Sequence, residues 1–167
     1  MGAFCYNLQK LLKILMTLYI DGDAFPNLLK PILLRTIHRV GIPAIVVSNK
    51  RITLGESDAV AYVIVEEGLD EADHRIVEMV APGDLVITAD IPLADRVVAK
   101  EAHAIDHRGE LYTKENIKQY LAMRNLMETI RDTGEVTRGP APFGPKDAHA
   151  FANQVNAFLD RWQRQSP

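Results

Sequence analysis

Three pairs of aspartates suggest what chemistry this sequence can perform. They are Asp21 and Asp23, Asp70 and Asp73, and Asp90 and Asp95. Each pair stands where a predicted strand or loop turns into a predicted helix. Carboxylates at such junctions can point into the crevice beyond the strand ends, where open α/β sheets bind ligands. Several carboxylates that converge there would bind a hard cation such as Mg²⁺ or Mn²⁺, and such sites commonly serve phosphate chemistry.

Helix capping is a simpler explanation for part of this pattern. Asp23 can cap the helix that follows it, and Asp70 fits an N-cap with Asp73 in the first turn. Asp90 can likewise cap the next helix, which carries a proline near its start. Capping gives no role to Asp21, which closes an apolar run, and it explains only one carboxylate of the third pair. For Asp23 and Asp73 both explanations stay open.

Apolar periodicity predicts the elements that must position these residues. Strands are predicted at residues 17–21, 43–48, 60–65, 84–88 and 102–105, and helices at 26–40, 71–80, 91–100, 113–131 and 146–164. Strands that alternate with helices predict a three-layer α/β/α fold with a mainly parallel sheet, plus C-terminal helices. Right-handed crossovers then bring the carboxyl ends of the strands to one edge.

Domain organisation follows from the same pattern. Residues 1–15 are interpreted as an extension outside the domain, and residues 16–131 as the α/β domain. Residues 132–167 contain a loop rich in Gly and Pro and a last helix, which we expect to pack on that domain.

Composition narrows the classes of protein to consider. The chain has 167 residues, a net charge of −3 and a pI near 5.9, so nucleic acid could be held only through a local basic patch. Its single cysteine does not suffice for a Cys/His zinc site, and the five histidines are interpreted as surface or helix-face residues. No segment predicts membrane insertion or export, so a cytoplasmic location is expected.

Basic residues near the same edge are candidates for substrate binding. Lys50 and Arg108 follow predicted strands, and Arg138 and Lys146 lie in and just after the Gly/Pro loop. Taken singly, each is best explained as solvated surface. Beside an acidic cluster they could hold phosphates while the carboxylates hold metal.

Two other α/β enzyme classes can be compared with the sequence. Asp21-Gly22-Asp23 matches the D-x-D that opens phosphatases of the haloacid dehalogenase type, and Thr88 fits their second motif. Lys100 fits the third, but no acidic pair follows at a strand end. The G-x-G-x-x-G of dinucleotide-binding folds is absent after the first strand, which excludes that class.

Several motifs together resemble the YaiI/YqxD family of bacterial proteins. They are Asp21–Pro26 (DGDAFP), Gly68–Asp73 (GLDEAD), Gly83–Ala94 (GDLVITADIPLA), Arg108–Tyr112 (RGELY), Asn116-Ile117 and Gly139-Pro140. The resemblance runs from about Met16 to Arg164. That family is largely uncharacterised and is grouped by fold with PIN-like domains, which are metal-dependent ribonucleases.

The resemblance implies roles for particular aspartates. Asp21, Asp73 and Asp90 match the positions that hold divalent metal in PIN nucleases, with Asp95 as the fourth and Asp23 assisting. The chain departs from the family pattern at Gly22, Phe25 and Arg138, where Ala, Cys and Gly are usual. None of these departures removes a carboxylate.

The leading hypothesis is therefore a Mg²⁺- or Mn²⁺-dependent phosphodiesterase that acts on RNA. The alternatives are a non-catalytic PIN-like module that binds RNA or a protein, and a small-molecule phosphatase. The sequence leaves self-association open and gives neither the substrate nor the metal.

Overall fold

The computed structural model describes residues 16–165, and the predicted N-terminal extension lies outside this range. The strands are β1 (Leu18–Asp21), β2 (Ala44–Ser48), β3 (Val60–Ile64), β4 (Leu85–Ile87), β5 (His103–Ile105) and β6 (Leu111–Tyr112). The helices are α2 (Leu29–Val40), α3 (Glu71–Met79), α4 (Ile91–Ala99), α5 (Ile117–Asp132) and α6 (Pro145–Gln165).

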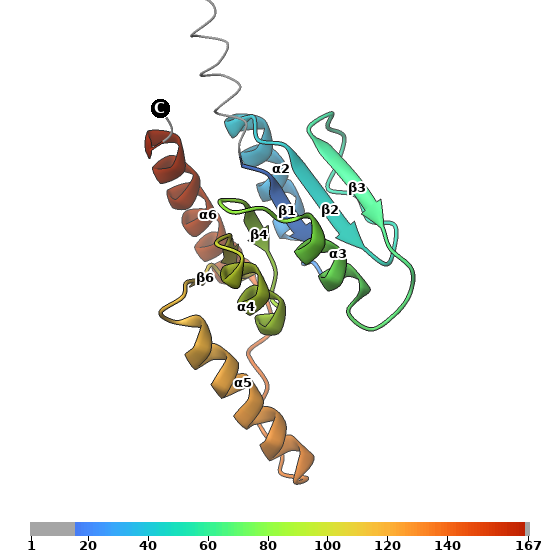
Figure 1. The fold of residues 1–167 in the computed structure, drawn as a ribbon, viewed down its shortest axis with the longest axis vertical. Coiled ribbons are helices and arrows are strands. Elements are labelled where there is room, and N and C mark those ends of the chain that lie inside the picture. The colour runs from blue at the N-terminus through green and yellow to red at the C-terminus, as the bar shows by residue number, and fades with distance from the viewer. Residues whose placement is uncertain (1–15, 166–167) are drawn as a thin grey trace, which may run out of the picture.

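All six strands form one sheet in the order β3-β2-β1-β4-β5-β6. Figure 1 shows β3, β2, β1 and β4 side by side in that order. Every neighbouring pair is parallel except β5 and β6, which are antiparallel. The predicted α/β fold with a mainly parallel sheet is confirmed. β4 lies between β1 and β5, as expected for a strand made almost entirely of apolar residues.

Alternating side chains divide the core into two layers, one on each face of the sheet. Leu18 and Ile20 of β1 pack in a cluster with the buried faces of α2 and α6. Tyr19, between them in sequence, joins the opposite cluster, which contains α3, α4 and the first residue of α5. This period of two is what places helices on both faces of the sheet and gives three layers. Among the described residues, no helix is both long and apolar enough to cross a membrane.

The largest differences from the predicted elements are at the starts of two helices and at one strand. Helix α2 begins at Leu29 rather than residue 26, and this puts Pro31 in the first turn, where the missing N–H would have no partner anyway. Helix α5 begins at Ile117, after a turn in which Thr113 and Asn116 exchange side-chain to backbone hydrogen bonds. The sequence did not predict β6, because two residues are too few to show a period.

The tight turn between β5 and β6 packs directly against α6. Asp106 organises this turn, since its Oδ1 accepts hydrogen bonds from the N–H groups of Arg108 (2.9 Å) and Glu110 (2.8 Å). Gly109 has φ +88°, and a Cβ there would lie 2.6 Å from the carbonyl oxygen of Ala150. The turn therefore requires glycine both for its backbone conformation and for the close approach of the helix.

We predict that Gly109→Ala destabilises the protein more than Gly83→Ala does. Gly83 has φ +89°, and a Cβ there would meet no atom within 4 Å, so its substitution tests the backbone conformation alone. We expect a loss of about 1 kcal/mol at Gly83. The steric clash should add about 1–3 kcal/mol at Gly109. Urea denaturation measures both losses, and equal losses would contradict this account of the turn.

Candidate functional site

The strand order reverses between β1 and β4, and the candidate site lies at this point. The chain adds β2 and β3 on one side of β1, then crosses over to place β4 and β5 on the other side. In open α/β sheets the crevice at such a reversal is where ligands bind. Asp21 ends β1, and Thr88 follows directly after β4, so both reach this crevice.

A chain of hydrogen bonds joins the ends of these two strands. The Thr88 hydroxyl donates to Asp21 Oδ2 at 2.9 Å and accepts from the Asp90 N–H at 3.0 Å. Asp90 Oδ1 in turn accepts from the N–H of Leu93 at 2.9 Å and caps α4, as predicted. Two carboxylates are thereby held in fixed orientations by neighbouring backbone and hydroxyl groups.

Asp23 connects the loops that follow β1 and β2. Its Oδ1 accepts from the N–H of Asn49 at 3.0 Å, and its own N–H donates to Asp21 Oδ1 at 3.3 Å. Asp23 does not cap α2, whose N-cap is Leu28. The capping explanation is therefore wrong for Asp23, and its carboxylate instead fixes the wall of the crevice.

The start of α3 also differs from the capping explanation. The Asp70 carbonyl accepts the first helical hydrogen bond, from the N–H of His74 at 2.8 Å, but its carboxylate makes no cap hydrogen bond. Asp70 has φ 63°, and Ala24 in the loop after β1 has φ 58°. Backbone in this region is strained for an ordinary side chain, and such strain concentrates at functional sites. Both residues line the same cavity.

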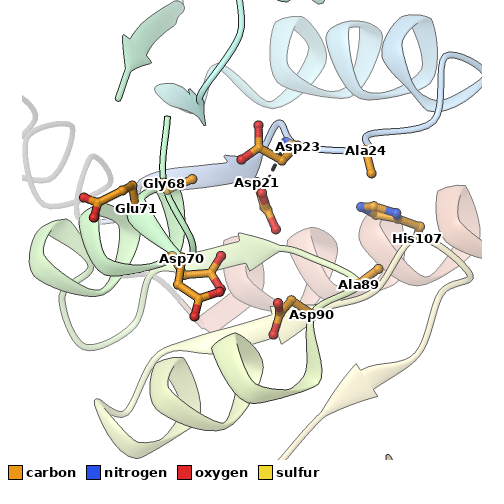
Figure 2. A pocket seen from close by; sticks show the side chains of 11 residues that line it. Asp21, Asp23, Ala24, Gly68, Asp70, Glu71, Ala89, Asp90 and His107 are labelled. Atoms are coloured by element: carbon orange, nitrogen blue, oxygen red, sulfur yellow. Dashed lines mark hydrogen bonds between the residues drawn. The ribbon is translucent and has the colours of Figure 1, made fainter. Parts of the chain in front are cut away.

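This cavity, which we call the acidic cavity, has a volume of about 330 Å³. Six acidic residues line it: Asp21, Asp23, Asp70, Glu71, Asp73 and Asp90. Its other lining residues are Ala24, Gly68, Ala72, Ala89 and His107. Figure 2 shows carboxylates entering it from the end of β1, the start of α3 and the start of α4. Within residues 16–165, no Lys or Arg side chain lines it.

Burial, together with uncompensated negative charge nearby, shifts the pKa of two of these carboxyls. Burial raises the pKa of Asp21 to about 6, although the hydrogen bond from Thr88 opposes the shift. Burial, together with the nearby carboxylates of Asp90, Asp21 and Asp70, raises the pKa of Asp73 to about 7. A charged group that is partly buried among like charges lacks a counter-ion, and a cation would supply one.

The carboxylate oxygens of the acidic cavity are suitable ligands for a hard cation, but the side chains are not spaced to hold one. Carboxylate oxygens are the ligands that Mg²⁺ and Mn²⁺ prefer. In the described part of the chain, however, no three His, Cys, Asp or Glu side chains are grouped so that they could hold a metal ion as they stand.

The structure does not bring Asp95 to this cavity. Its Oδ1 lies 2.7 Å from Lys118 Nζ of α5, and it is not among the lining residues. Asp95 therefore joins α4 to α5 as half of an ion pair, whereas Asp21, Asp23, Asp73 and Asp90 line the cavity together.

The basic residues predicted to bind substrate lie outside the cavity wall. Lys50, Arg138 and Lys146 are exposed. Arg108 pairs with Asp147 at 3.0 Å and donates to the carbonyl of Ala141 at 2.7 Å, so it anchors the Gly/Pro loop and the start of α6.

Glu71 and His107 line the cavity but were not among the site residues predicted from the sequence. The interpretation of the histidines as surface or helix-face residues is wrong here, because His107 is 8% exposed and follows β5. Its ring meets the Phe25 ring edge to face, with 5.3 Å between centroids. Burial, together with the Arg108 charge, lowers its pKa to about 4, so the ring is neutral near pH 7. The strand-end rule that singled out Asp21 and Asp90 applies equally to His107.

Comparison with known proteins agrees with the motifs in the sequence. Residues 19–161 match the model of a family described as uncharacterized BCR, YaiI/YqxD family. The chain belongs to this family. It is 70% identical to a UPF0178 protein from a Sulfurovum species over 144 residues, which cover 86% of this chain and 97% of that protein. A UPF0178 protein from a Nitratiruptor species is 60% identical, over 89% of this chain and 98% of the relative. No solved structure matches the chain significantly.

The raised pKa values predict that the acidic cavity destabilises the protein as the pH rises. Asp21 and Asp73 hold protons more tightly in the folded chain than in the unfolded chain. Their contribution to stability is therefore full below about pH 4 and is lost as the pH passes through about 6 and about 7. We expect the free energy of unfolding, measured with urea, to fall between about pH 5 and about pH 8 in metal-free buffer.

Asp73→Asn should flatten this pH dependence. At about pH 8 the variant should be more stable than the wild type by on the order of 1 kcal/mol, since solvent screens a half-buried carboxylate. Asp95→Asn is the matched control, because Asp95 is ion-paired with Lys118 outside the cavity. Stabilisation of both variants by the same amount would contradict the assignment of the effect to the cavity.

Proposed function

We propose that this protein is a divalent-metal-dependent phosphodiesterase that acts on RNA. The observation that carries the proposal is the acidic cavity at the β1/β4 reversal, with six acidic residues and no Lys or Arg among its described lining residues. Such a cavity repels a phosphodiester by itself. It becomes suited to phosphate chemistry only when a cation stands between the carboxylates and the substrate.

Asp21, Asp73 and Asp90 are the residues proposed to hold the cation, with Asp23 assisting. Thr88 orients Asp21, and the α4 cap orients Asp90, so these two are pre-positioned before any ion binds. Asp73 belongs to α3 on the opposite wall of the cavity and supplies the third carboxylate. A bound Mg²⁺ or Mn²⁺ would lower the pKa of a coordinated water and stabilise charge on the phosphate.

Exposed basic residues are proposed to bind the flanking phosphates. Lys50 directly follows Asn49, whose N–H contacts Asp23, so it stands next to the cavity wall. Arg138 and Lys146 belong to the loop and helix that Arg108 anchors through Ala141 and Asp147. Arg108 itself is occupied by these contacts and is assigned a positioning role.

The proposal predicts that Asp90→Asn loses both metal binding and RNA cleavage. Asparagine is as good an N-cap as aspartate, so the variant should keep α4 while it removes the charge. We expect wild-type binding of Mn²⁺ and Mg²⁺ by calorimetry, and cleavage of a mixed-sequence single-stranded RNA. Asp90→Asn should bind the ions at least about tenfold more weakly. Asp95→Asn, outside the cavity, should behave like the wild type.

Other outcomes would assign the protein to a different class. No metal binding at millimolar concentrations would overturn the catalytic proposal. RNA binding without cleavage that persists in Asp90→Asn would favour a binding module. Hydrolysis of a generic aryl phosphate would favour a small-molecule phosphatase.

A further inference from the structure

His107 lines the acidic cavity, and one of its ring nitrogens has no hydrogen-bond partner among the described residues. Its Nε2 atom is buried and has no hydrogen-bond partner among the described residues. A buried polar atom without a partner destabilises the fold, so such atoms are rare unless a ligand or water satisfies them. Figure 2 shows the ring between Ala24 and Ala89, directed from the end of β5 toward Asp21.

The described surroundings pack against the ring without forming hydrogen bonds to its nitrogens. Phe25 packs edge to face against it, and this contact is apolar. The next residue, Arg108, forms an ion pair with Asp147. The carboxylate of the preceding residue, Asp106, accepts a hydrogen bond from the backbone of its own turn. No hydrogen bond to another described residue therefore fixes which edge of the ring faces the cavity, and a half-turn about Cβ–Cγ exchanges the two edges.

A neutral imidazole beside several carboxylates has the character of a metal ligand. An imidazole must be unprotonated to bind a metal, and this ring is already neutral near pH 7. A cationic imidazole would instead pair with a carboxylate, and no such ion pair involves His107 in the described structure. The ring therefore supplies a donor of a second type to a cavity whose other donors are oxygens.

We propose that His107 binds the divalent cation directly, so that the acidic cavity is a mixed nitrogen and oxygen site that favours Mn²⁺ over Mg²⁺. This inference rests on the proposed function, because it assigns a further ligand to the same cation. Mg²⁺ takes oxygen ligands almost exclusively, whereas first-row transition ions accept imidazole nitrogen. The site would therefore select its metal through one residue on the β5–β6 turn.

Pulsed electron paramagnetic resonance on the full chain with bound Mn²⁺ tests this ligand directly. The wild type should show electron-spin-echo modulation from a coordinated nitrogen, and ¹⁵N-histidine labelling should change that modulation. His107→Gln should lose it and bind Mn²⁺ at least about tenfold more weakly, with Mg²⁺ binding nearly unchanged. His149→Gln, an exposed histidine on α6, is the matched control and should keep the nitrogen signal.

The outcomes separate this inference from the proposed function. Mn²⁺ bound without nitrogen modulation in the wild type overturns the role of His107 and leaves the carboxylate site standing. Nitrogen modulation that survives in His107→Gln also overturns it. No binding of Mn²⁺ overturns both proposals together. If His107→Gln does not fold, the labelled wild type and His107→Asn decide the question.

Discussion

The hydrogen bond between Thr88 and Asp21 joins the two strands on which the rest of the site depends. It is buried, it spans 67 positions in the sequence, and it ties the end of β1 to the end of β4. These strands are neighbours only because the chain reverses its direction of growth across the sheet. Without that reversal Asp90 would cap a helix far from Asp21. With it, one hydroxyl contacts both the Asp21 carboxylate and the Asp90 backbone N–H, and the two residues line the same cavity.

The acidic cavity lowers the stability of the folded protein at neutral pH. Burial and neighbouring like charges make ionisation of Asp21 and Asp73 unfavourable, which is the reverse of the usual stabilising effect of carboxylates. The strained backbone of Ala24 and Asp70 adds a further cost at the same place. A fold that lacked a ligand there would gain by losing these features. Their concentration around one cavity is the physical reason to look for a cation there rather than elsewhere on the molecule.

Much of this architecture could be predicted from local patterns. Alternation of apolar runs predicted the parallel sheet, and the strand-end rule identified Asp21 and Asp90. The exclusion of Asp95 could not be predicted, because its partner Lys118 is brought close only by the packing of α5 on α4. The left-handed backbone conformation of Asp70 could not be predicted either, since an aspartate before a helix normally caps that helix with its side chain. His107 escaped prediction because its burial depends on Phe25, which lies 82 positions earlier in the chain.

The C-terminal helix has a part in the site although it contributes no lining residue. Helix α6 packs on the same face of the sheet as α2, and it meets the β5–β6 turn where Gly109 allows close approach. Asp147 at its start holds Arg108, the neighbour of His107, and keeps that cation turned away from the cavity. A cation directed inward would offset the negative charge of the carboxylates. The contact between the turn and α6 therefore does more than close the core, since it keeps the Arg108 charge out of the acidic cavity.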